Sequence, residues 1–99
     1  MKKIIGGKIV DTDKGVTVAL HMLEYGHRSI ELIDGVYYLQ TVGGNDIQSP
    51  KDDVEEIGAG CSESLLPYAS GHDEWSRNAE LIAHIEEVLW GGVGFIIGQ

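Results

Sequence analysis

Cys61 is the side chain of this sequence best suited to nucleophilic chemistry, since it is the one cysteine of the chain. A cysteine nucleophile needs a neighbouring base or a positive field to form its thiolate. Gly-Ala-Gly before Cys61 and Ser-Glu-Ser after it match no known nucleophile pattern. We therefore predict no catalytic residue and no enzyme, and we keep a small Cys61-dependent enzyme as an alternative.

The four histidines are the natural candidates for metal ligands: His21, His27, His72 and His84. None forms an i, i+4 pair on a helix, and no H-E-x-x-H pattern occurs. A single cysteine also excludes a cysteine-based zinc cage and an internal disulfide. The glycine string from Gly92 to Gly98 follows an expected helix, whereas a dinucleotide loop must follow a strand and open a helix. We predict neither a metal nor a cofactor.

The excess of acidic residues in the second half of the chain is the most distinctive feature of the sequence. The net charge is −9, and residues 51–87 hold Lys51 and Arg77 against ten acids, a balance of −8. Such a charge argues against direct binding to nucleic acid or to an anionic membrane. Carboxylates spaced along helices can instead imitate the phosphates of a nucleic acid, and they would then bind the basic surface of a nucleic-acid-binding protein or complex.

Exposed ion pairs are individually weak, so such a surface also needs apolar anchors. Tyr38 and Trp90 are the plausible anchors. The predicted partner-binding residues are Asp52, Asp53, Glu55, Glu56, Glu80, Glu87, Tyr38 and Trp90.

The first half of the chain predicts β-hairpins that would position these residues. Strands at residues 2–5 and 8–11 flank Gly6-Gly7, and residues 16–22 alternate with period two. The clearest hairpin joins residues 29–33 to 36–41 through Asp34-Gly35, which pairs Ile33 with Val36. Its core face would carry Ile30, Leu32, Tyr37 and Leu39, and its other face would be mixed.

The second half predicts helices. Ser49, Pro50 and Asp52 resemble a helix start, which gives a short helix to about Ile57 that ends at Gly58. One long amphipathic helix is expected over residues 73–90, with His84 on its polar face and Gly91-Gly92 as its stop, and a last strand over residues 93–97. With 99 residues we predict a single α+β domain, 1–99: a small antiparallel sheet with this long helix packed on one face.

The opening Lys3-Ile-Ile-Gly-Gly-Lys-Ile-Val-Asp-Thr12 resembles the start of a group of small phage and mobile-element proteins that begin K-x-I-x-G-K-x-Y-D-T. The hairpin Glu31-Leu-Ile-Asp-Gly-Val-Tyr-Tyr-Leu39 and Gly43-Gly44 extend the resemblance over about 45 residues. The chain departs from the pattern at Val10 and throughout residues 50–99. The resemblance implies a small non-catalytic accessory protein, of which anti-CRISPR inhibitors are the best-known kind, and it carries over no functional residue.

Together these observations predict an acidic inhibitor that blocks the basic surface of a host defence protein such as a CRISPR effector. No apolar run approaches about 20 residues and no signal-peptide core is present, so we expect the cytoplasm of a bacterial host and no membrane. An immunity protein for a basic toxin nuclease is one alternative. Another is a self-assembling module that uses Ile33, Val36 and Tyr38 as its dimer surface, so a monomer and a homodimer both stay open.

Overall fold

The computed structural model describes residues 1–44, 47–48, 51–59, 62–71 and 73–97, with the backbone alone for residues 62, 73–74 and 89–97. Strands account for more of the chain than helices. The strands are β1 (Lys2–Ile5), β2 (Lys8–Asp11), β3 (Val16–Leu23), β4 (Tyr25–Ile33), β5 (Val36–Gly44) and β6 (Asp53–Ala59). The helical segments are η1 (Thr12–Lys14), η2 (Ser62–Leu65), α1 (Leu66–Gly71), α2 (Asp73–Ser76) and α3 (Ala79–Ile97).

The main sheet has four antiparallel strands in the order β3-β4-β5-β6, and β1 and β2 form a separate two-stranded hairpin. The predicted hairpins are confirmed. Gly6 and Gly7 have φ of 57° and 79°, and Asp34 and Gly35 have φ of 49° and 78°, as two-residue hairpin turns require. Ile33 pairs with Val36 and Ile30 pairs with Leu39, the register expected from the sequence.

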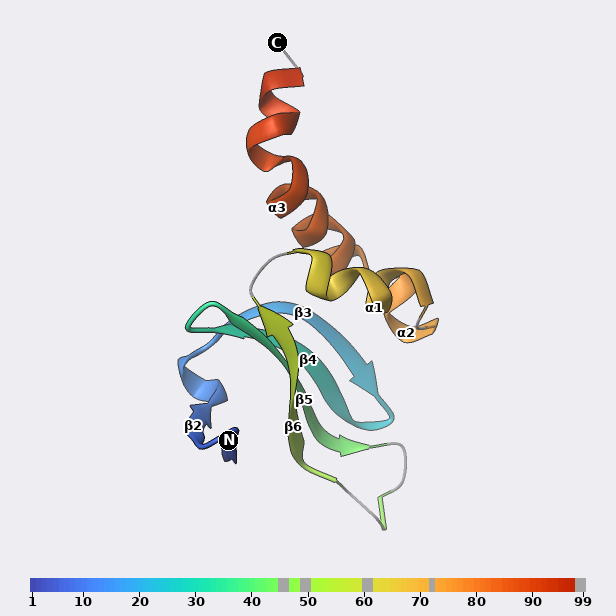
Figure 1. Cartoon of the computed structure of the whole chain (residues 1–99). Helices are drawn as coiled ribbons and strands as arrows, with labels where there is room; N and C mark the ends of the chain where they lie inside the picture. The colour runs from blue at the N-terminus through green and yellow to red at the C-terminus, as the bar shows by residue number, and fades with distance from the viewer. Residues whose placement is uncertain (45–46, 49–50, 60–61, 72, 98–99) are drawn as a thin grey trace.

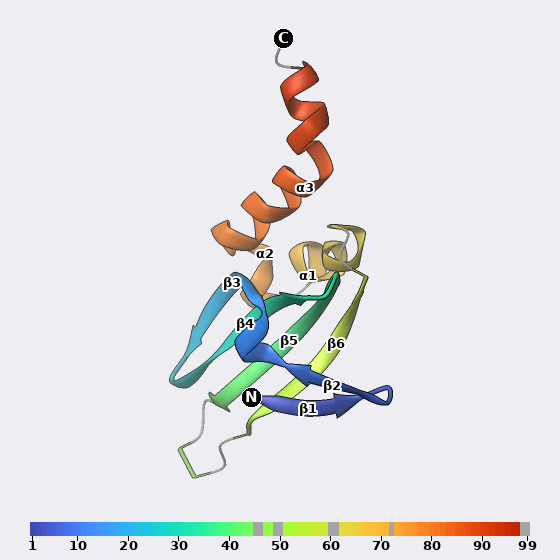
Figure 2. The ribbon, with the colours of Figure 1, turned by 90° about the vertical axis from the view of Figure 1, so that its left-hand side faces the viewer.

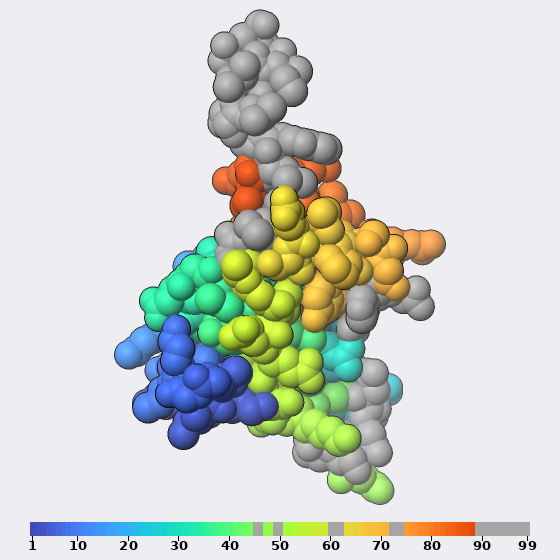
Figure 3. Space-filling view, viewed as in Figure 1, coloured from blue at the N-terminus to red at the C-terminus, as the bar shows by residue number. Residues whose placement is uncertain are grey.

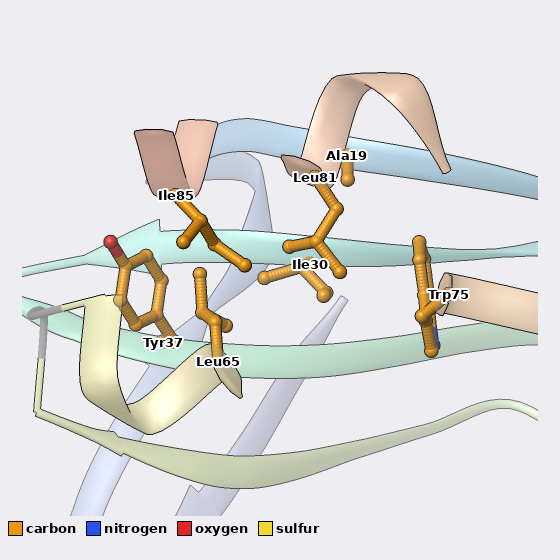
Figure 4. Close-up of a cluster of buried hydrophobic side chains, with 7 residues drawn as sticks. All are labelled: Ala19, Ile30, Tyr37, Leu65, Trp75, Leu81 and Ile85. Atoms are coloured by element: carbon orange, nitrogen blue, oxygen red, sulfur yellow. The ribbon is translucent and has the colours of Figure 1, made fainter. Parts of the chain in front are cut away.

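Each face of the main sheet is covered by a different layer. On one face lies the β1–β2 hairpin (Figure 2). Its Val10 packs in one cluster with Ile33, Tyr38 and Val54 of the main sheet. On the other, the helical segments bury a second cluster with the sheet, drawn in Figure 4: Ala19, Ile30, Tyr37, Leu65, Trp75, Leu81 and Ile85. The expected core face of the β4–β5 hairpin is therefore the helix-covered face. The mixed face is closed by the first hairpin, so Ile33 and Tyr38 are not a free dimer surface.

The expected helix from Ser49 to Ile57 is wrong, because residues 53–59 form the edge strand β6. Ser49 and Pro50 lie outside the described residues. Thr41 pairs with Asp53 and Gln40 with Val54, and the Val54 side chain is fully buried beneath the first hairpin. The capping pattern is a local and weak preference, and backbone pairing with β5 together with the burial of Val54 outweighs it.

The expected fold class, a sheet with one long helix packed along its face, is also wrong. Arg77 and Asn78 interrupt the helix predicted over residues 73–90 and separate α2 from α3. Leu81 and Ile85 of α3 are buried, but farther along Val88 is 44% exposed, and the rest of α3 extends away from the sheet (Figure 1). The helical layer is therefore built from short segments and the first turns of α3.

The end of α3 differs from the expectation as well. Gly91-Gly92 does not stop the helix, and residues 93–97 are helical rather than a last strand. A glycine stop needs a left-handed residue, and the left-handed glycines of the described chain lie at other positions. Within the described residues, no helix is long and apolar enough to cross a membrane.

Candidate binding surface

Four adjoining elements contain no lysine or arginine, and three of them, β6, η2 and α3, carry exposed carboxylates. In sequence, β6, η2, α1 and α3 contain no Lys or Arg. In space, η2 contacts β6, α1 and α3, and Figure 3 shows β6 directly beneath the yellow atoms of η2 and α1. We call the six exposed carboxylates of these elements the acidic surface: Glu55, Glu56, Glu63, Glu80, Glu86 and Glu87.

None of these six carboxylates has a lysine or arginine partner. In the part of the chain that the structure describes, ion pairs join Met1 to Asp13 and Lys3 to Asp53, and neither includes a residue of the acidic surface. Unpaired exposed carboxylates add to one another and give a negative potential over contiguous elements. The acidic surface is therefore free to attract cationic groups of another molecule.

The neighbours of Glu55 and Glu56 show how β6 distributes its charge. Leu39 pairs with Glu55, which places Glu55 on the helix-covered face, and Tyr38 pairs with Glu56 on the hairpin side. Burial, and then the Glu55 charge, raise the pKa of the Tyr68 hydroxyl in α1. Burial and then Glu56 and Asp34 raise the pKa of the Tyr38 hydroxyl. Glu55 thus lies on the side of β6 that faces α1, whereas Glu56 lies on the opposite side, at the border of the acidic surface.

Asp52 and Asp53, which the sequence placed in the same cluster, have bonds within the chain. Oδ1 of Asp52 accepts a hydrogen bond of 2.8 Å from the backbone N–H of Gly43. Oδ1 of Asp53 accepts one of 2.5 Å from Nζ of Lys3, which also donates to the carbonyl oxygen of Val54 at 3.0 Å. The Lys3 hydrogen bond, followed by the backbone N–H of Val54, lowers the pKa of the Asp53 carboxyl. These two acids hold the ends of β5 and β6 in place.

The two expected anchors are placed differently from the expectation. Tyr38 is 4% exposed and belongs to the core under the first hairpin, so its ring offers no surface to a partner. The backbone of Trp90 belongs to α3, but its side chain is not among those that the structure describes. Leu66 of α1 and Val88 of α3, 41% and 44% exposed, are apolar residues that the sequence did not predict as partner contacts. What distinguishes these two residues is that they are exposed on α1 and α3, and only the fold reveals that exposure.

A separate hollow of about 420 Å³ lies between the first hairpin and the β4–β5 turn. Its lining is Lys2, Ile9, Asp11, Lys14, Ile33 and Asp34. Two lysines against two aspartates leave the hollow without net charge, so it selects neither a cation nor an anion. The hollow is not part of the acidic surface, and it gives no reaction class.

The histidines lie in separate surroundings. The His21 ring lies 5.9 Å from the Trp75 ring, and the His84 ring meets Tyr37 edge-on. No group of three or more potential metal ligands is found among the described residues. His72 and Cys61 lie outside them, so the alternative of a Cys61-dependent enzyme stays a hypothesis.

His84 was expected on the polar face of a helix, but it is half-buried and bonded to the core. Its Nε2 lies 2.6 Å from the hydroxyl of Tyr37, whose ring is fully buried. When the neutral ring carries its proton on Nδ1, Nε2 accepts a hydrogen bond from the Tyr37 hydroxyl. Burial lowers the pKa of His84, and the nearby Glu87 charge opposes that shift. His84 therefore links α3 to β5 best when it is neutral.

This arrangement predicts that acid weakens the fold. The unfolded histidine takes up its proton near pH 6.5, whereas folded His84 does so at a lower pH. Between these two values the unfolded chain binds more protons, so the free energy of unfolding falls as the pH drops below about 6.5 and is constant above about 7. Urea unfolding of the parent chain and of His84→Gln between pH 5 and 8 measures this fall. Equal pH dependence in the two proteins would contradict the prediction.

Comparison of the chain with protein-family models, with curated proteins and with solved structures finds no match.

Proposed function

We propose that the protein is a non-catalytic inhibitor that binds a basic, nucleic-acid-binding protein and occupies the surface where that protein holds phosphates. The observation that carries the proposal is the charge of four contacting elements, which hold six exposed carboxylates and no lysine or arginine. Contiguous carboxylates in this arrangement repeat the main feature of a nucleic-acid backbone, and they accelerate association with a basic partner.

Protection of a sheet edge is the competing explanation for part of this charge. Edge strands often carry charged residues, because these prevent pairing with the strands of other molecules. That explanation covers Glu55 and Glu56 on β6, but it does not cover Glu63 on η2 or Glu80 and Glu87 on α3. The helical carboxylates therefore favour binding over edge protection.

Leu66 and Val88 would supply the apolar contacts that a charged interface needs. Leu66 lies on α1, which contacts η2 and α3, Val88 lies on α3, and both are more than 40% exposed. A partner that covers them would exclude water from the neighbouring ion pairs and strengthen those pairs. That the partner is a host defence protein such as a CRISPR effector rests on the resemblance of the first 45 residues to phage accessory proteins.

Two triple variants of equal net charge test the proposal. Glu55→Gln/Glu63→Gln/Glu86→Gln removes three charges from the acidic surface, and Asp13→Asn/Glu24→Gln/Asp34→Asn removes three from elsewhere. Each tagged protein is used to capture proteins from a nuclease-treated bacterial lysate, and the captured partner is then titrated. We expect the first variant to bind about 3- to 100-fold more weakly than the parent, and the control to bind like the parent.

Salt provides the second readout. Binding of the parent chain should weaken strongly between about 0.05 M and about 0.5 M NaCl, because salt screens exposed charge pairs. The captured protein should itself bind DNA or RNA, and nucleic acid should compete with the inhibitor. Equal loss in both triple variants would assign the effect to net charge alone. Capture that neither variant changes would refute the acidic surface as the binding site.

A further inference from the structure

The two edge strands of the main sheet, β3 and β6, differ in charge. An edge strand exposes unpaired backbone groups, and proteins usually protect such an edge with charged side chains, a bulge or a covering segment. Among the described strands with a free edge, β1, β2 and β6 carry lysines or acids, whereas β3 has no lysine, arginine or acidic residue. Figure 2 shows β3 at the outer edge of the main sheet. β3 therefore needs another form of protection.

The composition of β3 is typical of a strand that pairs readily with other strands. Its eight residues, Val16–Leu23, include six apolar ones and no proline or glycine. Val16 and Met22 are each 66% exposed, and Leu20 is 39% exposed. Uncharged segments of high β-propensity are the ones that pair with strands of other molecules when they are left open.

A bulge protects the first part of this edge. The register of β3 against β4 shifts between Thr17 and Ala19. A bulge leaves one residue unpaired and bends the strand, which disturbs the row of hydrogen-bonding groups that an added strand would need. The regular part of the edge is therefore the short stretch from Ala19 to Leu23.

The side chain of Asn78 covers this regular part. Alternate residues of an antiparallel edge strand direct their N–H and C=O groups away from the neighbouring strand. Nδ2 of Asn78 donates a hydrogen bond of 2.9 Å to the carbonyl oxygen of Leu20, so Leu20 is one of these residues and Met22 is the next. An added strand would need the Leu20 carbonyl, which Asn78 already occupies.

Three further hydrogen bonds hold Asn78 in this position. Its backbone N–H donates to the Trp75 carbonyl at 3.1 Å, and its own carbonyl accepts from the N–H of Ile82 at 3.0 Å. Its Oδ1 accepts from the N–H of Leu81 at 2.9 Å. One end of the side-chain amide is thus bonded to α3 and the other to β3. The interruption between α2 and α3 is what places this amide beside the sheet edge.

We propose that Asn78 is an autoinhibitory contact: it keeps the β3 edge closed, and without it β3 of one copy pairs antiparallel with β3 of a second copy. Two identical strands can pair in this way about a two-fold axis, and the pairing joins strands without charged residues. The acids of β6 lie at the opposite edge, three strand spacings or about 14 Å away. The inference is independent of the proposed function, because the acidic surface takes no part in the pairing.

Sedimentation velocity of the parent chain and of Asn78→Ser, from about 5 to about 200 µM, tests the proposal. Serine can still cap α3 at the N–H of Leu81, but its shorter side chain cannot also hold the Leu20 carbonyl. We expect a parent chain of 10.8 kDa and a variant that associates at least about tenfold more tightly. Infrared spectroscopy should show added intermolecular β-structure in the variant, and far-UV circular dichroism of the dilute protein checks its fold.

Two lysine substitutions in the Asn78→Ser background locate the association. Met22→Lys adds a charge to β3 and should restore the monomer, because a lysine on an edge strand opposes pairing. Ile9→Lys makes the same change of charge at a residue of the first hairpin that is 73% exposed, and it should leave the association in place.

Salt gives an independent readout. The net charge of −9, together with Glu80 two residues after Asn78, opposes the meeting of two copies. Association of Asn78→Ser should therefore become tighter as salt screens this repulsion, whereas the binding of a basic partner becomes weaker.

Three results would overturn the proposal. The first is a folded Asn78→Ser variant that stays monomeric over the whole concentration range. The second is a parent chain that associates as tightly as Asn78→Ser. The third is an association of Asn78→Ser that Met22→Lys leaves intact. Aggregation of an unfolded variant would give this third result, because it would not depend on Met22.

Discussion

Trp75→Ala is expected to destabilise the protein by about 3–5 kcal/mol, the range measured for large aromatic residues removed from a core. Trp75 is fully buried, and it is the largest of the fully buried side chains of the described residues. A domain of this size is stabilised by only about 5–15 kcal/mol, so the variant should lose much of its stability. Its melting temperature should fall by roughly 12 °C or more.

The position of Trp75 explains why the loss should not be local. α2 has four residues, too few for a stable helix, so its side-chain packing holds it in place. The centre of the indole ring lies 5.9 Å from that of His21 on β3. The indole also belongs to the same cluster as Ile30 and Leu81 (Figure 4). The Trp75 carbonyl also accepts a hydrogen bond from the backbone N–H of Asn78. Asn78 in turn caps α3, since its Oδ1 accepts a hydrogen bond from the N–H of Leu81. Loss of the indole should therefore loosen the start of α3.

Two variants serve as controls for this prediction. Trp75→Phe keeps a buried ring and should lose less than about half as much, since the described residues give the Nε1–H of Trp75 no acceptor to lose. Met22→Ala, at a residue 66% exposed, should change stability by less than about 0.5 kcal/mol. Urea unfolding followed by far-UV circular dichroism measures all three. A loss below about 1.5 kcal/mol for Trp75→Ala would contradict the packing described for the helical layer.

The first half of the fold could be predicted because its signals are local. Gly6-Gly7 and Asp34-Gly35 supply the positive φ of two-residue turns, and such a turn determines which residues pair. Once Ile33 faces Val36, alternation assigns Ile30 and Tyr37 to one face of the sheet. Only the layer that covers each face required the structure.

The second half could not be predicted because non-local contacts decide it. Glu55 and Glu56 are good helix formers, but pairing with β5 and burial of Val54 hold them in a strand. The helical pattern over residues 73–90 predicts an apolar face of six residues: Trp75, Leu81, Ile82, Ile85, Val88 and Leu89. Trp75, Leu81 and Ile85 are buried and Ile82 is half-buried, but Val88 is 44% exposed, and the Leu89 side chain lies outside the described residues. The pattern did not reveal the interruption at Arg77 and Asn78.

The candidate site shows the same limit. Net charge and acid spacing identified the acidic half, and Glu55, Glu56, Glu80 and Glu87 are exposed. The bonds of Asp52 to Gly43 and of Asp53 to Lys3 join residues that are 9 and 50 positions apart, and sequence spacing carries no sign of them. Composition thus predicts the sign of the surface, whereas the fold decides which carboxylates stay free.

Gly43→Ala is the other substitution with a large expected effect, because it combines two independent penalties. Gly43 has a φ of 74°, a left-handed conformation that costs a residue with a Cβ about 1–2 kcal/mol. A Cβ at this position would also overlap the backbone carbonyl oxygen of Tyr25 on the neighbouring strand. Because the obstacle is backbone, no side-chain rotation relieves it. We expect a loss of roughly 3 kcal/mol or more.

Three other glycines separate the two penalties. Gly26→Ala keeps an ordinary φ but would overlap the Val42 carbonyl and lie 2.9 Å from Cα of Gly43, so it tests the steric penalty alone. Gly35→Ala has a φ of 78° with nothing within 4 Å of the new Cβ, so it tests the backbone penalty alone. Gly71→Ala carries neither and should be neutral. Urea unfolding should therefore rank the losses Gly43, Gly26, Gly35 and Gly71, from largest to smallest.

The double variant Gly26→Ala/Gly43→Ala gives the most specific result. Gly26 and Gly43 are directly paired on β4 and β5, and each Cβ would press on the backbone beside the other. Once one alanine has pushed the strands apart, the second meets space already opened, so the combined loss should be smaller than the sum of the single losses by more than about 0.5 kcal/mol. Additive losses would mean that β4 and β5 do not approach closely at this pair. In that case the hydrogen bond from Gly43 to Asp52, and not the close approach of the two glycines, would hold the end of β5 in place.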